Sequence, residues 1–268
     1  ATSYSTNNRI MVPFYVYYSM FGFQRIGDLA WAAGDMQARG FLLGGTSGRT
    51  TLNGEGLQHE DGHSHILANT IPNCVTYDPT FAHEVAVIMH HGMKRMVEQQ
   101  ENVFYYITLL NENYPMPGLT AGTEEQIIKG MYMCKPGAVP PQGTSGASEK
   151  RVQLLGSGTI LRESIAAQTL LAADWGIQAD VWSCPSFNEL TREGQDAERW
   201  NLLHPLETPR VPFVAQQLGT NTGPVVASTD YMKAYAEQIR PFIPKGRTYK
   251  VLGTDGFGRS DFRSKLRE

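Results

Sequence analysis

Short runs of β-branched and aromatic residues alternate with stretches of helical spacing along the chain, and this alternation constrains the fold more than any other sequence feature. Strands separated by helices usually pair in parallel, because each helix returns the chain to the same end of the sheet. The pattern predicts an α/β fold with largely parallel sheets. The expected strands cover residues 11–18, 41–45, 73–77, 103–110, 131–135, 152–155, 179–184, 225–228 and 249–252, and the expected helices cover residues 20–39, 79–98, 159–174, 188–203 and 231–240.

Two stretches rich in proline and glycine interrupt the alternation and are candidate domain boundaries. Residues 136–148 have the more linker-like composition. Strands are expected on both sides of that stretch, so we interpret it as a long hairpin loop and place the boundary within residues 113–122. The sequence therefore predicts two α/β domains, residues 1–119 and 120–268.

Charge, hydropathy and cysteine spacing narrow the class of protein. The net charge of −3 argues against a general nucleic-acid binder, which normally carries a basic patch. No apolar run reaches the length that crosses a bilayer. Cys74, Cys134 and Cys184 lie far apart without a CxxC pair, which favours reduced thiols of a cytoplasmic protein over a thiolate zinc site. The polar start, ATSYSTNN, lacks an initiator methionine, and we interpret the chain as part of a longer protein.

Residues 54–65, GEGLQHEDGHSH, concentrate histidines and carboxylates in one glycine-rich loop. Histidine titrates near neutral pH, so a His–Glu pair in such a loop could move protons. His59, His63 and His65 could alternatively bind a metal with nearby carboxylates, although the spacing does not match HExxH. A third interpretation is that these polar side chains only hold the loop by hydrogen bonds.

Aromatic residues gather where the first expected strand ends. Alternation along a strand places Tyr15 and Tyr17 on one face and Tyr18 on the other. Ligands of open α/β sheets bind beyond the carboxyl ends of strands, so Tyr18 and Phe21 are candidates for a ligand pocket. An aromatic core is the alternative.

Three other motifs are rejected as sites. Residues 155–158, LGSG, could form a phosphate nest, but without GxGxxG or a P-loop lysine we interpret them as a tight strand-to-helix turn. Residues 253–261, GTDGFGRSD, resemble a GDG magnesium–diphosphate motif only at first sight, because the order is TDG and the asparagine expected downstream is absent. GTSG at residues 45–48 lacks the spacing of a GxSxG nucleophile elbow.

Long segments of the sequence resemble the homodimeric bacterial type of pyruvate dehydrogenase first component, a transketolase-like family that depends on thiamine diphosphate. The resemblance covers essentially the whole chain, and its motifs are long and specific. It implies an N-terminally truncated pyrimidine-binding domain followed by a C-terminally truncated transketolase C-terminal-like domain. The matching segments are residues 17–66, TLLNENYPMPG at 108–118, VQLLGSGTILRE at 152–163, EGQDAERWNLLHPLETPRVPF at 193–213 and VLGTDGFGRSDFR at 251–263.

The resemblance also implies an activity and partners. The activity is oxidative decarboxylation of pyruvate, with transfer of the acetyl group to a lipoyl group of the dihydrolipoyl acetyltransferase component. The implied protein is a cytoplasmic homodimer within a multienzyme complex. Mg²⁺ and the diphosphate would be bound by a domain outside this sequence.

Motif positions in the family assign roles to individual residues. Phe21 would stack on the aminopyrimidine ring of the coenzyme, and Tyr18 would line the same pocket. His59 would donate a hydrogen bond or a proton to the bound intermediate, and Glu55 would orient His59 or join its acid–base network. His65 aligns with a histidine that transketolases use and is a further candidate for the substrate pocket.

Two departures from the family pattern bear on activity. The glutamate that activates the aminopyrimidine precedes the position of Ala1, and the magnesium–diphosphate motif is missing. We therefore expect the 268-residue chain alone not to decarboxylate pyruvate. Two alternative functions are a non-catalytic dimerisation or assembly module and a metal-dependent hydrolase built on the loop of residues 54–65.

Overall fold

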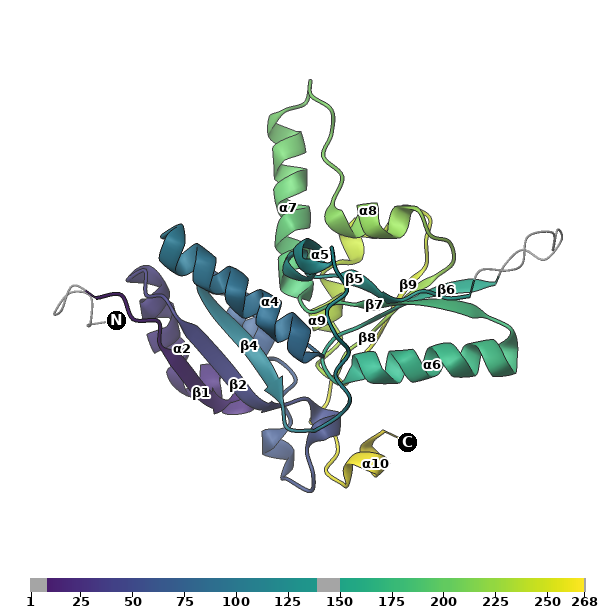
Figure 1. Ribbon diagram of the computed structural model, residues 1–268, viewed down its shortest axis with the longest axis horizontal. Coiled ribbons are helices and arrows are strands. Elements are labelled where there is room, and N and C mark those ends of the chain that lie inside the picture. The colour runs from purple at the N-terminus through teal and green to yellow at the C-terminus, as the bar shows by residue number, and fades with distance from the viewer. Residues whose placement is uncertain (1–8, 139–149, 268) are drawn as a thin grey trace.

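Two largely parallel β-sheets, one from each half of the chain, form the framework of the molecule (Figure 1). The computed structural model describes residues 9–138 and 150–267. Within these residues the first sheet has the strand order β1-β2-β4-β3 and is entirely parallel. The predicted α/β fold is confirmed. The strands of the first sheet are β1 (Phe14–Tyr18), β2 (Phe41–Ser47), β3 (Cys74–Tyr77) and β4 (Phe104–Leu110).

The second sheet has the strand order β5-β7-β6-β8-β9 in the described part of the chain, and its edge strand β5 is antiparallel to β7. β7 lies between β5 and β6, so the prediction of a hairpin joining residues 131–135 to residues 152–155 is wrong. A later strand takes the position that a hairpin partner would occupy, which local sequence does not reveal. The strands are β5 (Tyr132–Lys135), β6 (Arg151–Gly156), β7 (Gln178–Ser183), β8 (Val225–Ser228) and β9 (Tyr249–Leu252).

The five expected helices occur in the expected order with differences in extent, and four further short helices occur in the described residues. The helix expected over residues 20–39 ends at Asp35, and the helix expected to reach residue 98 ends at Met93, where a π-helical turn, Lys94–Glu98, follows. The helix expected from residue 79 begins at Ala82, because the Glu84 carboxylate accepts hydrogen bonds from the backbone N–H groups of Thr80 and Phe81 and so caps the first turn. The helix expected over residues 231–240 is only Ala234–Glu237. A 3₁₀ turn, Arg240–Phe242, follows it and contains Pro241, which cannot donate a helical hydrogen bond. The helices are α2 (Ser19–Asp35), α3 (Ser64–Asn69), α4 (Ala82–Met93), α5 (Glu124–Lys129), α6 (Ile160–Trp175), α7 (Phe187–Leu203), α8 (Phe213–Gly219), α9 (Ala234–Glu237) and α10 (Arg263–Leu266).

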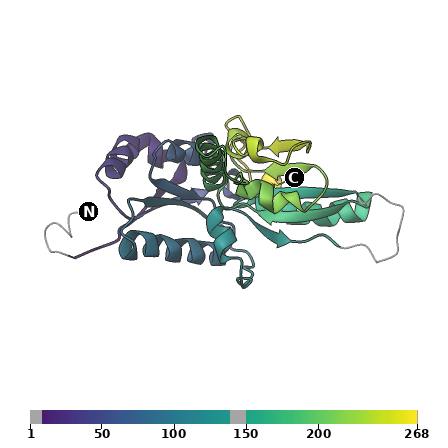
Figure 2. The same cartoon turned by 90° about the horizontal axis from the view of Figure 1, so that it is seen from above.

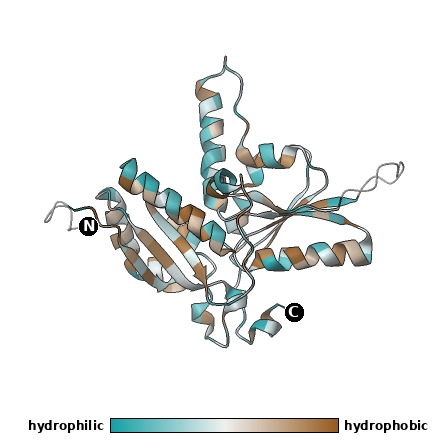
Figure 3. Cartoon of the chain, in the orientation of Figure 1, coloured by the Kyte–Doolittle hydropathy of each residue, from teal (hydrophilic) through white to brown (hydrophobic). Residues whose placement is uncertain are grey.

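Alternation along the strands gives each sheet two apolar faces, and helices cover both. In the first sheet Phe41 and Ile107 point to the face covered by α4, whereas Phe104 and Tyr106 point to the face covered by α2 and α3. Figure 2 shows α2 and α4 on opposite sides of this sheet, and Figure 3 shows the apolar residues along its strands. The second sheet is covered by α6 on one face and by α7, α8 and α9 on the other. The central strands of both sheets are therefore buried, as in most parallel sheets. The edge strand β1 is the exception, because Phe14, Tyr15, Val16 and Tyr18 are exposed, and its apolar composition alone did not reveal this.

The two domains meet where the carboxyl ends of strands from both sheets converge on one buried carboxylate, Asp78. This residue follows β3 and accepts hydrogen bonds from Thr108 of β4 at 2.6 Å, from Ser157 after β6 at 2.8 Å and from Tyr231 after β8 at 3.1 Å. Burial raises the pKa of Asp78 to about 6, although the three hydrogen bonds oppose that rise. The predicted tight turn at residues 155–158 is confirmed as the strand-to-helix link between β6 and α6, and its Ser157 supplies one of these bonds.

His65 belongs to the same buried network. Its Nε2 lies 3.0 Å from the Thr108 hydroxyl. Thr108 gives its one proton to Asp78, so the hydroxyl oxygen accepts from His65 and the imidazole is the Nε2–H tautomer. The ring stacks on Tyr235 and packs edge-on against Tyr231. Burial lowers the pKa of His65 to about 4, so the side chain is neutral at neutral pH.

The neutral state of His65 predicts acid sensitivity. Protonation favours the unfolded chain between the ordinary pKa of 6.5 and the folded value of about 4, so stability that is present above pH 6.5 is lost as the pH falls. The raised pKa values of Asp78 and Glu60 change stability in the opposite direction over the same range, so the contribution of His65 is the difference between the unsubstituted chain and a His65 variant. In urea titrations at pH 7 and pH 5 this difference should change with a slope approaching about 1.4 kcal/mol per pH unit. His65→Gln, which can still donate to Thr108, is the variant for this comparison, whereas His90→Gln on the exposed side of α4 should show no such change. An unchanged pH dependence in H65Q would contradict a neutral buried imidazole.

Candidate active site

Parallel pairing of β1 with β2 builds the predicted site. Tyr18, the last residue of β1, is in register with Gly45 near the end of β2. The chain turns from Tyr18 into α2, which carries Phe21 in its first turn, and from β2 into the loop of residues 48–63, called here the site loop. Gly22 lets the helix lie against Tyr17, because a Cβ at this position would fall 1.6 Å from the tyrosine ring. Both segments therefore leave the sheet at the same edge.

A bulge at the end of β2 redirects the chain into the site loop. The register of β2 with β4 shifts between Gly44 and Ser47. Thr46, which lies within this bulge, has φ of +56°. A left-handed conformation is strained for a β-branched residue and persists where surrounding contacts impose it. The Ser47 hydroxyl provides one such contact, because it donates to the Leu109 carbonyl of β4 at 3.1 Å.

Three rings from these two segments contact one another. The His59 imidazole lies edge-on to both aromatic rings, with centroids 5.4 Å from Tyr18 and 5.2 Å from Phe21. Tyr18 and Phe21 are 6.0 Å apart. Tyr18 is exposed and the other two rings are half-buried, so the three rings form an open shelf rather than core.

Glu55 completes the cluster. Its Oε2 lies 3.3 Å from Nδ1 of His59, at the four-residue spacing within the site loop. Both side chains keep about a quarter to a third of their surface exposed, at 26% for His59 and 30% for Glu55. The two facing atoms, Oε2 and Nδ1, are buried and make no hydrogen bond with any described residue, so the accessible surface belongs to the other atoms of the two side chains. A carboxylate close to Nδ1 favours a proton on that nitrogen.

The exposed side of α2 adds two contacts around the shelf. The guanidinium of Arg25 lies 4.4 Å from the centroid of the Phe21 ring, a cation–π geometry. Nε2 of Gln24 lies 2.8 Å from Nε2 of His63 in the site loop. The structure thus brings Tyr18, Phe21, Glu55 and His59 together, as the sequence predicted they would be.

Models of two families match the two halves of the chain. The pyruvate dehydrogenase E1 component middle domain matches residues 1–117, and the transketolase-like C-terminal domain matches residues 130–268. The chain belongs to the pyruvate dehydrogenase E1 family of transketolase-like proteins. The resemblance inferred from the sequence is confirmed.

Curated relatives in this family match the chain over its full length. The pyruvate dehydrogenase E1 component of Escherichia coli strain K12 is 65% identical over 268 residues, and that of Cupriavidus necator is 63% identical over 267 residues. In both cases the whole chain is covered, and it spans 29% of the relative's length.

Solved transketolases share the fold at low identity. Transketolase from Leishmania mexicana has a TM-score of 0.65 at 15% identity, covering 96% of this chain and 31% of the other. Transketolase from Campylobacter jejuni has a TM-score of 0.63 at 16% identity, covering 96% and 33%. A split-gene transketolase, described as an inactive β4 tetramer, has a TM-score of 0.62 at 15% identity, covering 95% and 70%.

His65 does not join the shelf of this E1-family chain. It is fully buried between the domains and its ring contacts are with tyrosines of the protein itself. Its surroundings favour a role in fixing the two domains. The tyrosines that enclose it, Tyr231 and Tyr235, lie far along the sequence, so the sequence offered no signal for this burial.

Glu60, the neighbour of His59, was expected only as one of the carboxylates of the loop, with no role of its own. Glu60 is only 2% exposed, and neither carboxylate oxygen has a hydrogen-bond partner among the described residues. Burial raises its pKa to about 7, with Arg49 opposing the rise and Asp230 and Glu55 adding to it. Burial of a residue in a charged loop is set by contacts distant in sequence, so no local pattern marked it.

Two absences hold for the part of the chain that the structure describes. No group of three or more His, Cys, Asp or Glu side chains is arranged to hold a metal ion. In residues 9–138 and 150–267 no helix combines the length and apolar character needed to span a membrane.

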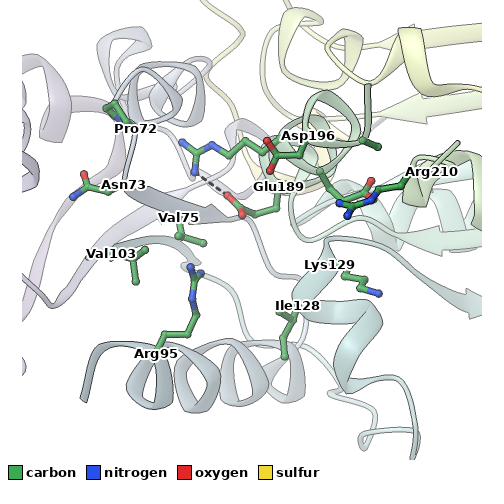
Figure 4. Close-up of a pocket in the computed structure, with 13 residues that line it drawn as sticks. Pro72, Asn73, Val75, Arg95, Val103, Ile128, Lys129, Glu189, Asp196 and Arg210 are labelled. Carbon is green, nitrogen blue, oxygen red and sulfur yellow. Dashed lines mark hydrogen bonds and ion pairs between the residues drawn. The ribbon is translucent and has the colours of Figure 1, made fainter. Parts of the chain in front are cut away.

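A cavity of about 440 Å³ lies away from the shelf, between the end of α4 and α7 (Figure 4). Its charged groups are largely satisfied by the protein. Arg192 pairs with Glu189 at 2.9 Å, and Arg95 pairs with Glu101 at 2.7 Å. No residue of the site loop lines it. We interpret it as a polar seam between the domains.

Glu60 predicts a second pH effect, opposite in sign to that of His65. Its raised pKa means that stability present below pH 4.5 is lost as the pH rises through about 7. Glu60→Gln removes the buried charge. The free energy of unfolding of this variant should therefore be about 1–3 kcal/mol higher than that of the unsubstituted chain at pH 8 and equal to it at pH 4. Urea titrations would measure this, with exposed Glu198→Gln of α7 as the control. Equal stabilities of E60Q and the unsubstituted chain at pH 8 would contradict a costly buried carboxylate.

Proposed function

We propose that this chain contributes the pyrimidine-binding side of a thiamine-diphosphate site that carries out oxidative decarboxylation of pyruvate. One observation carries the proposal, the contact of Tyr18, Phe21 and His59 beside Glu55 in a chain of the E1 family. Its curated relatives are named pyruvate dehydrogenase E1 component. We also propose the domain division at residues 119 and 120, because the connection between β4 and α5 spans residues 111–123.

The residues of the shelf fit the coenzyme's flat ring. Aromatic surfaces stack on planar rings, and an exposed aromatic side chain beyond the end of a parallel strand is available to do so. Phe21 would carry the aminopyrimidine, and Tyr18, which is 42% exposed, would border it. Arg25 packs against Phe21 and limits the positions that the ring can take.

When bound, thiamine diphosphate supplies the carbanion chemistry that decarboxylation of a 2-oxo acid requires. The chain's own residues orient and exchange protons. The charge of Glu55, 3.3 Å from Nδ1 of His59, would favour a proton on that nitrogen, which leaves Nε2 to donate to or accept from an oxygen of the substrate. The aromatic rings of Tyr18 and Phe21 shield one side of the imidazole from water and fix its plane.

Further parts of the proposal rest on the family. Mg²⁺ would bind with the diphosphate on a domain that this sequence does not include. The intact protein would be a cytoplasmic homodimer that passes the acetyl group to the dihydrolipoyl acetyltransferase component. His65 is proposed as a structural link between the domains that supports the pocket from behind.

The second candidate function is a non-catalytic assembly module. One observation favours it, since the split-gene transketolase that aligns with 95% of this chain is described as an inactive β4 tetramer. An isolated chain of this fold can therefore associate without activity. No observation favours the metal-dependent hydrolase.

The proposal predicts that the chain is inactive alone and active in the context of a whole E1 component. The purified chain with thiamine diphosphate, Mg²⁺ and pyruvate should release no CO₂. A chimera in which this sequence replaces the matching 268 residues of the Escherichia coli E1 component should release CO₂ and reduce an artificial electron acceptor. Turnover by the isolated chain would contradict the first expectation, and an inactive chimera that folds and binds the coenzyme would contradict the second.

Individual residues of the shelf should have separable effects in the chimera. Phe21→Ala should raise the dissociation constant of thiamine diphosphate about tenfold or more, because the ring loses its stacking surface, and Phe21→Tyr should restore most of the affinity. His59→Ala should lower kcat about 100-fold or more with a smaller change in coenzyme affinity. His90→Ala on α4 is the control. Tryptophan fluorescence would measure binding, and a role for His59 is excluded if its variant keeps full kcat.

A further inference from the structure

The site loop is fastened largely by the other domain. The Asp230 carboxylate, which follows β8, accepts hydrogen bonds from the backbone N–H and the hydroxyl of Thr50 at 3.1 and 2.9 Å. At the far end of the loop, the Gly62 carbonyl accepts from the backbone N–H of Met232 at 2.9 Å. Both ends of the loop are thus held by the segment that leaves β8.

The middle of the loop is held by residues 254–263, called here the C-terminal strap. The backbone N–H of Gly54 donates to the Asp261 carbonyl at 3.1 Å. The hydroxyl of Ser260 donates to the backbone carbonyl of Glu55. These two bonds fix the backbone on either side of the Glu55 α-carbon, the residue that pairs with His59.

Arg263 links three parts of the molecule. Its Nε donates to the Thr51 carbonyl of the site loop at 2.6 Å, and its Nη2 donates to the Asn111 carbonyl after β4 at 2.6 Å. A guanidinium can make both bonds at once because its donors are held in a rigid fork. The strap therefore sets the distance between the site loop and the first sheet.

Arg49 runs in the opposite direction, from the loop to the strap. It is 8% exposed, and its Nη1 donates to the Thr254 carbonyl at 2.5 Å. The guanidinium lies against Gly62, where a Cβ would fall 1.9 Å from Nη2. A side chain at position 62 would displace the guanidinium, so Gly62 leaves room for the contact that closes the loop onto the strap.

These contacts matter because the loop cannot order itself. Its regular structure in the described residues is two short 3₁₀ turns, Arg49–Thr51 and Leu57–His59. Ordering each backbone residue costs about 1–2 kcal/mol, and glycines such as Gly54 and Gly56 lie at the upper end. The hydrogen bonds from the strap to the loop offset that entropic cost.

We propose that the C-terminal strap is a positioning element for the proposed reaction, with Ser260 and Arg263 setting where Glu55 and His59 stand relative to the aromatic shelf. The proposal rests on the proposed function. It assigns a role to the GTDGFGRSD motif, which the sequence analysis rejected as a diphosphate site. It also separates binding of the coenzyme from positioning of the reacting groups. Tyr18 and Phe21 belong to β1 and α2, and among the described residues neither makes a hydrogen bond with the strap.

Amide hydrogen exchange in the 268-residue chain tests whether the strap holds the loop. Arg263→Ala should raise exchange in residues 51–60 roughly tenfold or more, because two charge-assisted bonds are lost. Arg263→Lys should restore part of the protection. Ser260→Ala is a second variant, in case Arg263→Ala does not fold. Arg259→Ala is the matched control, because Arg259 lies in the strap and its side chain has no hydrogen bond to the loop among the described residues.

The chimera tests whether holding the loop positions the reacting groups. Arg263→Ala and Ser260→Ala should lower kcat about tenfold or more while the dissociation constant of thiamine diphosphate changes less than threefold, and Arg259→Ala should change neither. Equal hydrogen exchange in R263A and R259A would overturn the claim that the strap holds the loop. Faster exchange in R263A together with full kcat would overturn the claim that the strap positions the reacting groups. An inactive unsubstituted chimera would count against the proposed function, and hydrogen exchange would still decide whether the strap holds the loop.

Discussion

Parallel pairing of β1 with β2 is the interaction on which the rest of the site depends. It places the carboxyl ends of two neighbouring strands at one edge, so a helix start and a long loop must leave the sheet side by side. A one-residue slip of β1 would turn Tyr18 to the opposite face and break its contact with His59. The open shelf is therefore a consequence of strand register before it is a consequence of side-chain chemistry.

The junction between the domains is both polar and buried. Asp78 takes bonds from both sheets, and Asn188 of α7 donates to Thr76 at 2.6 Å and to the His65 carbonyl at 2.9 Å. Buried polar networks of this kind specify one arrangement, because any other leaves charges and donors unpaired. Orientation of the two sheets is thus fixed by hydrogen-bond geometry as well as by apolar packing.

Local sequence was enough to locate the strands, but it did not reveal which strands lie next to each other in a sheet. The strands at residues 225–228 and 249–252 were predicted to the residue, because short apolar runs between turns are distinctive. The supposed hairpin failed because β7, distant in sequence, inserts between β5 and β6. For the site, Tyr18, Phe21, Glu55 and His59 could be grouped because family motifs add information that periodicity lacks. The burial of His65 and Glu60 depends on the second domain and could not be predicted from the loop that carries them.

The bond from Arg263 to Thr51 joins residues 212 positions apart in the chain. A ribosome adds about 5–20 residues per second, so the loop emerges many seconds before Arg263, which holds it in place. The first sheet can form from its own strands in that interval, whereas the loop stays unfastened until the second domain has emerged and docked. Ordering of the site loop is therefore a late event in biosynthesis. A nascent chain halted before residue 263 would carry a folded first sheet with a disordered site loop.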